Sequence, residues 1–422
     1  IKPVADPSSE SSLTMTAALD VPSLIDLATA CEIAIAQVEG IRTLRDLPLA
    51  AALGHVCARD ILATSAMPFF TNSAVDGFAL RLADLAETPH VLPVAGTVAA
   101  GVGYPDTLPD GAALRIYTGA PLPEGADCVV ALEEVTEANG RIHLDFLPQT
   151  GANIRMRGSD QPLGAVLLPR GTRIAPQHVG LLAANGIGRV PVIRRPRAVV
   201  LSTGDELAQG GQRGAGQIFD ANRPMLLALA QLAGCEAVDG GTMPDAVVPL
   251  AHRLADLAGT ADLVLSSGGV SLGGRDPIRP AFAMAGGEIA GWRVAVKPGK
   301  PVMFGRIGDT AFTGLPGNPM AAFVGFHLFV KQQIDRLSGR SPDPFAARKA
   351  RAAFSWRHRP GRQEVFPVRC LGTDGTGLPL LERLGNGVSA TLFPLSQADG
   401  LATVAALDRK STRLNSSHAN VS

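Results

Sequence analysis

The feature that most constrains the fold is a regular alternation of strand-like and helix-like apolar segments between residues 198 and 337. Short, continuously apolar runs predict buried strands, and longer runs with apolar residues at helical spacing predict helices. Such alternation is typical of a mainly parallel sheet with helices on both faces. The predicted strands are 198–201, 263–265, 294–296 and 311–313, and the predicted helices are 224–233, 247–257, 277–285 and 319–337.

The flanking sequence predicts further domains around this α/β sheet domain. Residues 22–39, 48–59 and 175–186 carry helical patterns, whereas short β-like runs separated by Gly and Pro turns lie between 91 and 146. We therefore expect an α/β multidomain chain. Its parts are a discontinuous helical and extended N-terminal domain (21–64 and 145–192), a small β domain (65–144), the central mainly parallel α/β sheet domain (193–340), a C-terminal β domain (341–408) and a polar, non-native tail (409–422).

Charge and cysteine usage exclude several classes of protein. Lys plus Arg and Asp plus Glu both total 38, so the formal net charge is zero. No overall field favours nucleic acid or an anionic membrane, and no apolar stretch is long enough to span a bilayer. The five cysteines are widely spaced, odd in number and without C-x-x-C spacing. We therefore expect no zinc site or disulfide framework, and a cytoplasmic location.

The loop at residues 266–276 follows the second predicted strand and consists of small residues ending in a carboxylate. Backbone N–H groups around Gly268, Gly269 and Ser271 have room to close on an anion such as phosphate. Asp276 adds a charge suited to a metal or a proton. The alternative is an ordinary strand-to-helix turn that needs glycine dihedral angles.

Three other loops predicted at the same sheet edge carry charges or stiff turns. Because ligands of parallel sheets bind beyond the carboxyl ends of strands, we expect the charges of these loops to meet there. Carboxylates beside lysines suit a phosphate-bearing ligand with Mg²⁺, and the two prolines of the last loop predict a rigid turn before a helix. The residues are Asp205, Glu206, Lys297, Lys300, Pro316 and Pro319. Each is ordinary as a single surface residue, but recurrence in four loops favours a site.

Two stretches in the N-terminal half also carry candidate chemistry. Residues 72–79 place Asp76 among small side chains, and residues 151–160 contain Arg155, Arg157 and Asp160. Arginine forks suit phosphate or an oxyanion such as molybdate.

Seven stretches, taken in this order, resemble the molybdopterin molybdenumtransferases, the MoeA family, whose animal relative is gephyrin. The resemblance covers nearly the whole chain and gives the sheet domain the molybdopterin-binding type of fold. The matching stretches are 72–79, 118–127, 151–160, 202–207, 267–276, 297–301 and 315–319.

The resemblance implies insertion of molybdate into adenylylated molybdopterin with release of AMP, helped by Mg²⁺. It implies a homodimer with an active site shared between subunits, and contact with molybdopterin adenylyltransferase and molybdoenzyme chaperones. Acids at positions matching those implicated in the family's activity are Asp76, Asp160, Glu206, Asp245 and Asp276, with Asp245 in the least distinctive surroundings. We expect Asp276 and Glu206 at the metal. Residues expected to bind substrate are Gly268, Gly269, Ser271, Lys297, Lys300, Pro316, Pro319 and Arg155.

Two alternatives remain at this point. A molybdopterin adenylyltransferase shares the sheet domain but lacks the long N-terminal half and the C-terminal β domain. A gephyrin-like scaffold reuses the fold without catalysis, but the fused domain and long linker of gephyrin are not visible in this sequence.

Overall fold

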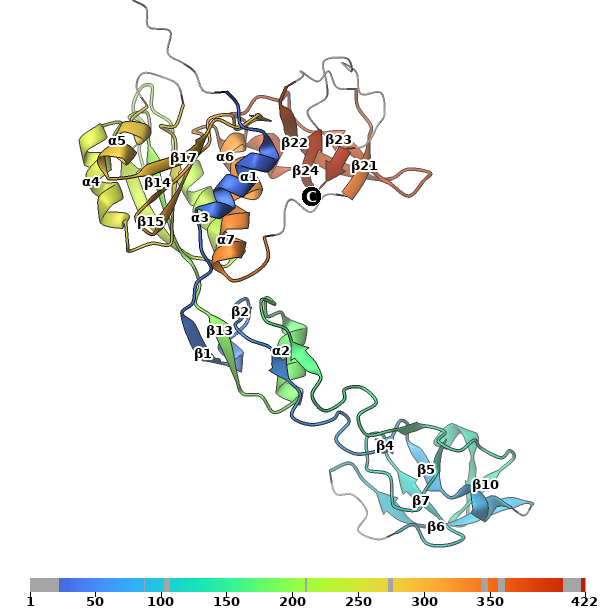
Figure 1. Ribbon diagram of the computed structural model, residues 1–422. Helices are drawn as coiled ribbons and strands as arrows, with labels where there is room; N and C mark the ends of the chain where they lie inside the picture. The colour runs from blue at the N-terminus through green and yellow to red at the C-terminus, as the bar shows by residue number, and fades with distance from the viewer. Residues whose placement is uncertain are drawn as a thin grey trace, which may run out of the picture. The chain divides into compact units, whose positions relative to one another are not determined.

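The computed structural model describes residues 23–421 apart from residue 87 and residues 102–106, 209–210, 272–275, 343–347, 356–360 and 405–418. The chain divides into two compact units. One contains the residues up to Arg42 together with those from Arg194 onward, and the other contains Thr43–Ile193. Figure 1 shows the ribbon of both units, which are described separately below.

A six-stranded sheet forms the centre of the first unit. Its order is β15 (Glu236–Met243), β14 (Arg197–Thr203), β16 (Leu263–Ser267), β20 (Thr310–Leu315), β19 (Met303–Ile307) and β17 (Glu288–Trp292). The first four strands are parallel, and the last two pairings are antiparallel. The predicted mainly parallel α/β domain is therefore confirmed.

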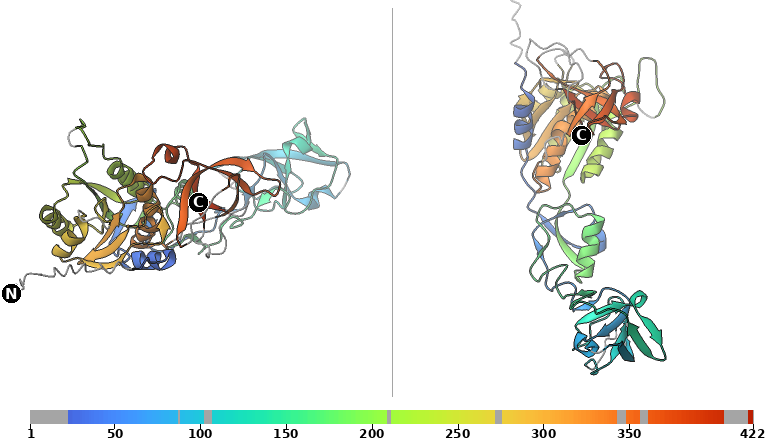
Figure 2. Two further views of the ribbon diagram at one scale, coloured as in Figure 1. Left: turned by 90° about the horizontal axis from the view of Figure 1, so that it is seen from above. Right: turned by 90° about the vertical axis from the view of Figure 1, so that its right-hand side faces the viewer.

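Helices cover both faces of this sheet (Figures 1 and 2). Alternate residues of each strand point to opposite faces, so Val200 and Leu265 pack in one hydrophobic cluster and Val199 and Val264 in the other. The first face is covered by α1 (Leu27–Ala36), α3 (Asn222–Ala233), α6 (Pro319–Gly325) and α7 (Lys331–Leu337). The second face is covered by α4 (Val247–Leu257) and α5 (Ile278–Met284). The helix predicted over 319–337 is present, with a π-helical turn (Phe326–Val330) between α6 and α7.

A second six-stranded sheet completes this unit. Its order is β18 (Val296–Lys297), β22 (Gln363–Thr373), β23 (Pro379–Arg383), β21 (Arg348–Ala352), β25 (Ala419–Val421) and β24 (Gly400–Val404), with the short helix α8 (Phe393–Ser396) beside it. The expected C-terminal β domain is thus present. The strand predicted at 294–296 overlaps β18. Its assignment to the central sheet is wrong, because β18 pairs with β22 of the C-terminal sheet. β25 lies within the segment 409–422 that the sequence sets apart as a tail.

The second unit contains the small β domain. Its sheet has the order β8 (Cys128–Ala131), β5 (Gly77–Leu80), β7 (Ala113–Ile116), β6 (His90–Val98), β10 (Arg141–Leu144) and β9 (Thr136–Ala138). The 3-10 turns η2 (Leu82–Leu85) and η3 (Leu132–Glu134) connect its strands. All of these elements lie within the stretch that we expected to form this domain.

Most of the rest of the second unit packs around helix α2 (Pro176–Ala184). Beside it lie a three-stranded sheet and one strand pair, whereas a second strand pair lies against the small β domain (Figure 1). The sheet has the order β1 (Leu44–Pro48), β13 (Arg189–Ile193) and β2 (Val56–Cys57), and the pairs are β3 (Ile61–Leu62) with β12 (Val166–Leu168) and β4 (Asn72–Ser73) with β11 (Ile154–Arg155).

Two N-terminal expectations differ from what the structure shows. The helix predicted at 48–59 is wrong: one 3-10 turn, η1 (Leu49–Ala51), precedes β2, whose backbone pairs with β13. The segment 21–64 was expected to form one domain, but helix α1 contacts α7 and the π-helical turn of the first unit, and the division falls after Arg42. Helix α1 buries Ala30 and Ala34 in the hydrophobic cluster on the first face of the central sheet. It therefore packs as part of the sheet domain. Of the helices in the described ranges, none is both long and apolar enough to cross a membrane.

The first prediction concerns a close backbone approach in the central sheet. A Cβ atom at Gly305 would lie 2.4 Å from the Glu288 carbonyl oxygen and 2.9 Å from Phe282 Cε1. We expect Gly305→Ala to lower the free energy of unfolding by about 2 kcal/mol, because neither the backbone nor the buried ring has room to move. Gly375→Ala, where a Cβ meets nothing within 4 Å, is the control. Urea unfolding of both variants measures the difference, and equal stabilities would contradict this account.

Candidate active site

Four acidic side chains gather at the carboxyl ends of the parallel strands. Asp205 and Glu206 follow β14, Asp245 follows β15, and Asp276 follows the loop after β16. The backbone N–H of Asp245 donates to Asp205 Oδ1 at 3.1 Å. Partial desolvation raises the pKa of Asp245, and the negative charges of Asp205, Glu206 and Asp276 raise it further. The structure therefore brings together Asp205, Glu206 and Asp276, the acids predicted at this edge, and adds Asp245, which only the resemblance had named.

Asp276 has an unsatisfied oxygen in this group. Its Oδ2 atom is buried and has no hydrogen-bond partner within the described part of the chain. Buried polar atoms normally have partners, so this oxygen is suited to a ligand, an ion or water. In the described ranges, no group of three or more His, Cys, Asp or Glu side chains is close enough to hold a metal alone. The acids fit a cation that takes one or two carboxylates and completes its shell with substrate oxygens.

The glycines after β16 serve mainly to pack the loop against the protein itself. Gly268 has φ +92°, and a Cβ there would lie 2.6 Å from the Thr203 carbonyl oxygen. Gly269 has φ +67°, and its Cβ would lie 2.8 Å from both Ile278 Cγ1 and Thr203 Oγ1. The N–H of Gly268 donates to the Leu315 carbonyl at 3.1 Å. The expectation that this amide is open to an anion is therefore wrong. Ser271 is exposed, and residues 272–275 lie outside the described residues.

The lysines occupy a different place from the one expected. Lys297 Nζ lies 3.1 Å from Glu364 Oε1, and the Glu364 side chain is only 3% exposed. Because β18 belongs to the C-terminal sheet, Lys297 is directed to that sheet by its own strand. Lys300 is half-buried, and its carbonyl accepts a hydrogen bond from the N–H of Val294. No described ion pair joins either lysine to the four acids.

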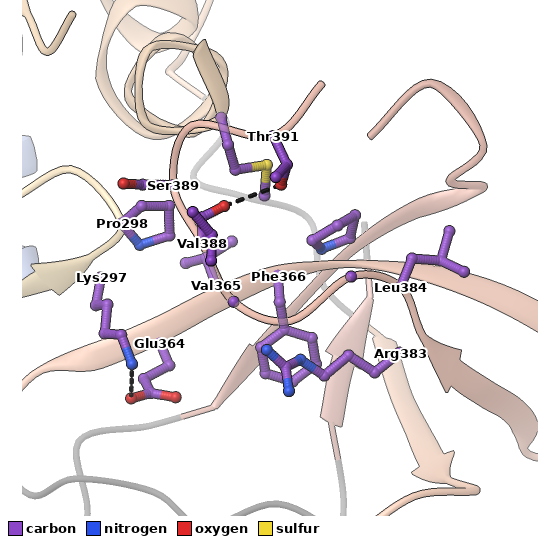
Figure 3. A pocket seen from close by; sticks show the side chains of 14 residues that line it. Lys297, Pro298, Glu364, Val365, Phe366, Arg383, Leu384, Val388, Ser389 and Thr391 are labelled. Carbon is purple, nitrogen blue, oxygen red and sulfur yellow. Dashed lines mark hydrogen bonds and ion pairs between the residues drawn. The ribbon is translucent and has the colours of Figure 1, made fainter. Parts of the chain in front are cut away.

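A pocket lies where Lys297, the start of α6 and the C-terminal sheet meet (Figure 3). Lys297 and Arg383 bring positive charge, and Ser389 and Thr391 bring hydroxyl groups. The Arg383 guanidinium lies over the Phe366 ring, 5.3 Å from its centroid. Sequence reasoning missed Arg383 and Ser389, because nothing in the short β segments of that region distinguishes them from ordinary surface residues.

The proline turn joins this pocket to the central sheet. Pro316 is buried after β20, and Pro319 is the first residue of α6, as predicted. Asn318 Nδ2 donates to Ser389 Oγ at 2.7 Å, and the N–H of Met320 donates to the Ser389 carbonyl at 3.2 Å. One of the amides at the start of this helix is thus occupied by the C-terminal domain.

In the second unit, the three motif stretches of the N-terminal half converge. Thr118 donates to Asp76 Oδ1 through its N–H at 2.7 Å and through its hydroxyl at 2.8 Å. These bonds, the backbone one first, lower the pKa of Asp76. Arg155 pairs with Asn72 in the ladder of β4 and β11 and is exposed, as is Asp160. The unit therefore presents two acids and an arginine on chain segments that lie next to one another.

Comparison with known proteins identifies the family of this chain. Three family models match: the MoeA N-terminal region (domain I and II) at 25–186, a probable molybdopterin binding domain at 199–336 and the MoeA C-terminal region (domain IV) at 349–409. The molybdopterin molybdenumtransferase of Haemophilus influenzae is 39% identical over 307 residues, covering 71% of this chain and 76% of the relative. That of Nostoc sp. is 35% identical over 392 residues, covering 91% and 90%.

This chain belongs to the MoeA family of molybdopterin molybdenumtransferases. A crystal structure of the molybdopterin biosynthesis MoeA protein from Pyrococcus horikoshii superposes with a TM-score of 0.80 at 25% identity, covering 95% of this chain and 100% of that one. A second crystal structure of a molybdopterin biosynthesis MoeA protein from the same organism gives a TM-score of 0.76 at 28% identity, covering 94% of this chain and 98% of that one. The resemblance stated from the sequence and the multidomain fold are thus confirmed. The roles of individual residues stay predictions.

The second prediction concerns the acids at the MoeA sheet edge. A raised pKa in the folded state means that the stabilising contribution of Asp245 is present at acid pH and is lost as the pH rises through that pKa. We expect Asp245→Asn to raise the melting temperature at pH 7, because it removes repulsion from three acids, and this gain to shrink as the pH falls towards 4. Thermal unfolding across this pH range measures it. A gain that does not depend on pH, or a loss at pH 7, would contradict the repulsion.

Proposed function

We propose that this MoeA-family protein is an enzyme that inserts molybdate into adenylylated molybdopterin with release of AMP, a transferase step of molybdenum cofactor biosynthesis. The named relatives support the reaction class. The observation that carries the proposal is the group of four acids at the carboxyl edge of a sheet, with one carboxylate oxygen unpartnered in the described structure. Such an edge is where this type of fold binds its ligands.

Breaking a phosphoanhydride requires that the charge of its oxygens be neutralised. Asp276 and Glu206 are the residues we assign to Mg²⁺, since carboxylate oxygens are its preferred protein ligands. When bound, the ion supplies positive charge to the phosphate oxygens. Lys297, Arg383 and Ser389 would hold an oxyanion. We assign molybdate to their pocket because its two cations outnumber the one carboxylate, Glu364, and its hydroxyl groups can donate to a tetrahedral dianion.

We assign to Asp245 the transfer of the proton that the attacking oxygen loses. An acid with a raised pKa is better suited to accept and return a proton near neutral pH than an ordinary carboxylate. A water oxygen attacks the phosphorus on the molybdopterin side, forms a new P–O bond and passes a proton to Asp245, while the bridging P–O bond breaks and AMP leaves with the electron pair. The two thiols of the dithiolene replace one oxygen of molybdate, which leaves as water with their two protons.

We further propose a homodimer in which Asp76 of one subunit completes the site of the other, with Arg155 and Asp160 near it. The support is that the motif stretches form two separate groups, one in each unit of the chain. Contact with molybdopterin adenylyltransferase and molybdoenzyme chaperones follows from this role, because a reactive cofactor is best handed on directly. The described cysteines form no disulfide, in keeping with the cytoplasmic location we propose.

The third prediction tests the reaction with Asp276→Asn. Protein, adenylylated molybdopterin, molybdate and Mg²⁺ are mixed, and AMP is measured with and without molybdate. We expect molybdate-dependent AMP release by the wild type and a loss of at least about 100-fold in the variant, the scale of removing one electrostatic stabiliser from an active site. Asp309→Asn, at a fully exposed acid of the same unit, is the control and should keep wild-type activity. Full activity of Asp276→Asn would overturn the assignment, and ATP-dependent synthesis of the adenylylated cofactor would identify an adenylyltransferase.

The fourth prediction tests the shared site by mixing two inactive variants. Asp76→Asn and Asp276→Asn are unfolded together and refolded, so that half of the dimers carry one of each chain. If each site uses acids from both subunits, one site of every mixed dimer is intact, and about a quarter of the wild-type activity returns. Refolding each variant alone is the control. Failure of the mixture to regain activity, while mixed dimers are present by mass spectrometry, would show that both acids serve the same chain.

A further inference from the structure

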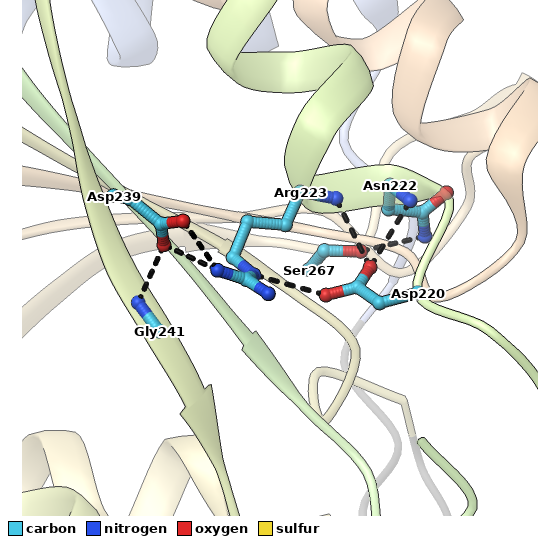
Figure 4. A network of polar contacts seen from close by, with 6 residues as sticks. All are labelled: Asp220, Asn222, Arg223, Asp239, Gly241 and Ser267. Carbon is cyan, nitrogen blue, oxygen red and sulfur yellow. Dashed lines mark hydrogen bonds and ion pairs between the residues drawn. The ribbon is translucent and has the colours of Figure 1, made fainter. Parts of the chain in front are cut away.

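A buried amide ties together two loops at the edge of the central sheet. Asn222 begins helix α3 and is 7% exposed. Its Nδ2 atom donates to Ser267 Oγ at the end of β16 and to the Gly317 carbonyl in the proline turn, both at 2.7 Å (Figure 4 shows the bond to Ser267). One side chain therefore bridges the ends of two neighbouring strands.

The chemistry of the partners fixes which way the amide points. The Gly317 carbonyl only accepts hydrogen bonds, so the nitrogen of Asn222, and not its oxygen, must face it. Ser267 Oγ accepts from Asn222 and lies 3.5 Å from the Pro316 carbonyl, towards which its own hydrogen points. An aspartate of the same shape would lose both donated bonds and face the Gly317 carbonyl with an oxygen.

The two loops that the bridge joins lie in direct contact. The N–H of Gly268 donates to the Leu315 carbonyl, and a Cβ at Gly317 would lie only 3.6 Å from Gly268 Cα. A change in the spacing at Ser267 therefore displaces the backbone of Gly268 and Gly269 against the Pro316–Gly317 turn.

Asn222 is itself held from the other side. Asp220 Oδ1 accepts from the N–H groups of Asn222 and Arg223, both at 3.1 Å, and Arg223 Nε donates to Asp220 Oδ2 at 3.1 Å. Arg223 also pairs with Asp239 on β15 (Figure 4). Although partial burial acts in the opposite direction, the hydrogen bonds from Arg223 and Gly241 lower the pKa of Asp239. The network thus connects β15, α3, β16 and the turn after β20.

We propose that Asn222 is a positioning residue that fixes the spacing between the Ser267–Gly269 backbone and the Pro316–Gly317 turn, and with it the shape of the edge that binds the substrate. The proposal rests on the proposed function. Asn222 acts through Ser267 and Gly317 and touches no reacting atom. Its loss therefore weakens binding of substrate and transition state alike, which raises KM and leaves kcat nearly unchanged.

The fifth prediction compares two variants in which a buried amide becomes an acid. We expect Asn222→Asp to raise KM for adenylylated molybdopterin by at least about tenfold, with kcat within about threefold of the wild type. Gln333→Glu is the matched control. Its amide is fully buried in the same unit and donates to the Ala34 carbonyl at 3.0 Å, away from the sheet edge. It should lower the melting temperature and leave KM unchanged.

A second measurement needs no substrate. Hydrogen exchange of a peptide spanning 263–271 reports on the Gly268 amide, which is protected by its bond to Leu315. We expect this peptide to exchange at least about tenfold faster in Asn222→Asp than in the wild type, and at the wild-type rate in Gln333→Glu. Ser267→Ala, which removes only the hydroxyl acceptor, should show a smaller effect of the same kind and remains informative if Asn222→Asp does not fold.

The outcomes separate this inference from the proposed function. A wild-type protein that releases no AMP refutes the function, whereas the exchange measurement still tests the spacing. A wild type that is active while folded Asn222→Asp keeps the wild-type KM and exchange overturns the positioning role. An equal rise of KM in Asn222→Asp and Gln333→Glu also overturns it, because it shows a general loss of stability.

Discussion

The close approach of Gly268 and Gly269 to the end of β14 is the constraint on which the sheet edge depends. Any side chain at either position would collide with Thr203, so the loop lies directly on the neighbouring strand. This contact, together with the bond from Gly268 to Leu315, places the ends of β14, β16 and β20 in one layer. The glycines therefore hold the loop in place, and the contacts to a ligand are left to the side chains around the loop.

How much the sequence predicts depends on how apolar each element is. Strands β14, β16 and β20 are buried on both faces and were predicted from continuous apolar runs. Strand β15 was missed because it lies at the sheet edge and contains Asp239, Gly240 and Gly241 instead of an apolar run. Because β15 was not predicted, there was no structural ground in the sequence for placing Asp245 beside the other acids.

Long-range pairing decides what sequence patterns leave open. Lys297 follows an apolar run like those of the central strands, yet β18 pairs with β22, 67 residues later in the chain. Its ion pair with Glu364, and the pocket that includes Arg383 and Ser389, arise from that pairing alone. Local spacing carries no information on such contacts: the loop pattern supplied Lys297 as a candidate but placed it with the acids of the central sheet.

The sheet edge combines a rigid backbone with repulsive charges. Partial burial, and after it the charges of three neighbouring acids, raise the pKa of Asp245, so the folded protein holds these carboxylates together at a cost in stability. The network of Asp220, Asn222, Arg223 and Asp239 acts in the opposite sense, because each of its charges has an opposite charge or an N–H donor facing it. A cation would relieve the repulsion at the acids, whereas the charged groups of the network already face partners of their own. The two groups therefore have different roles. The network keeps the strand ends in position when no ligand is bound. The repulsion among the acids provides free energy that favours binding of a cation.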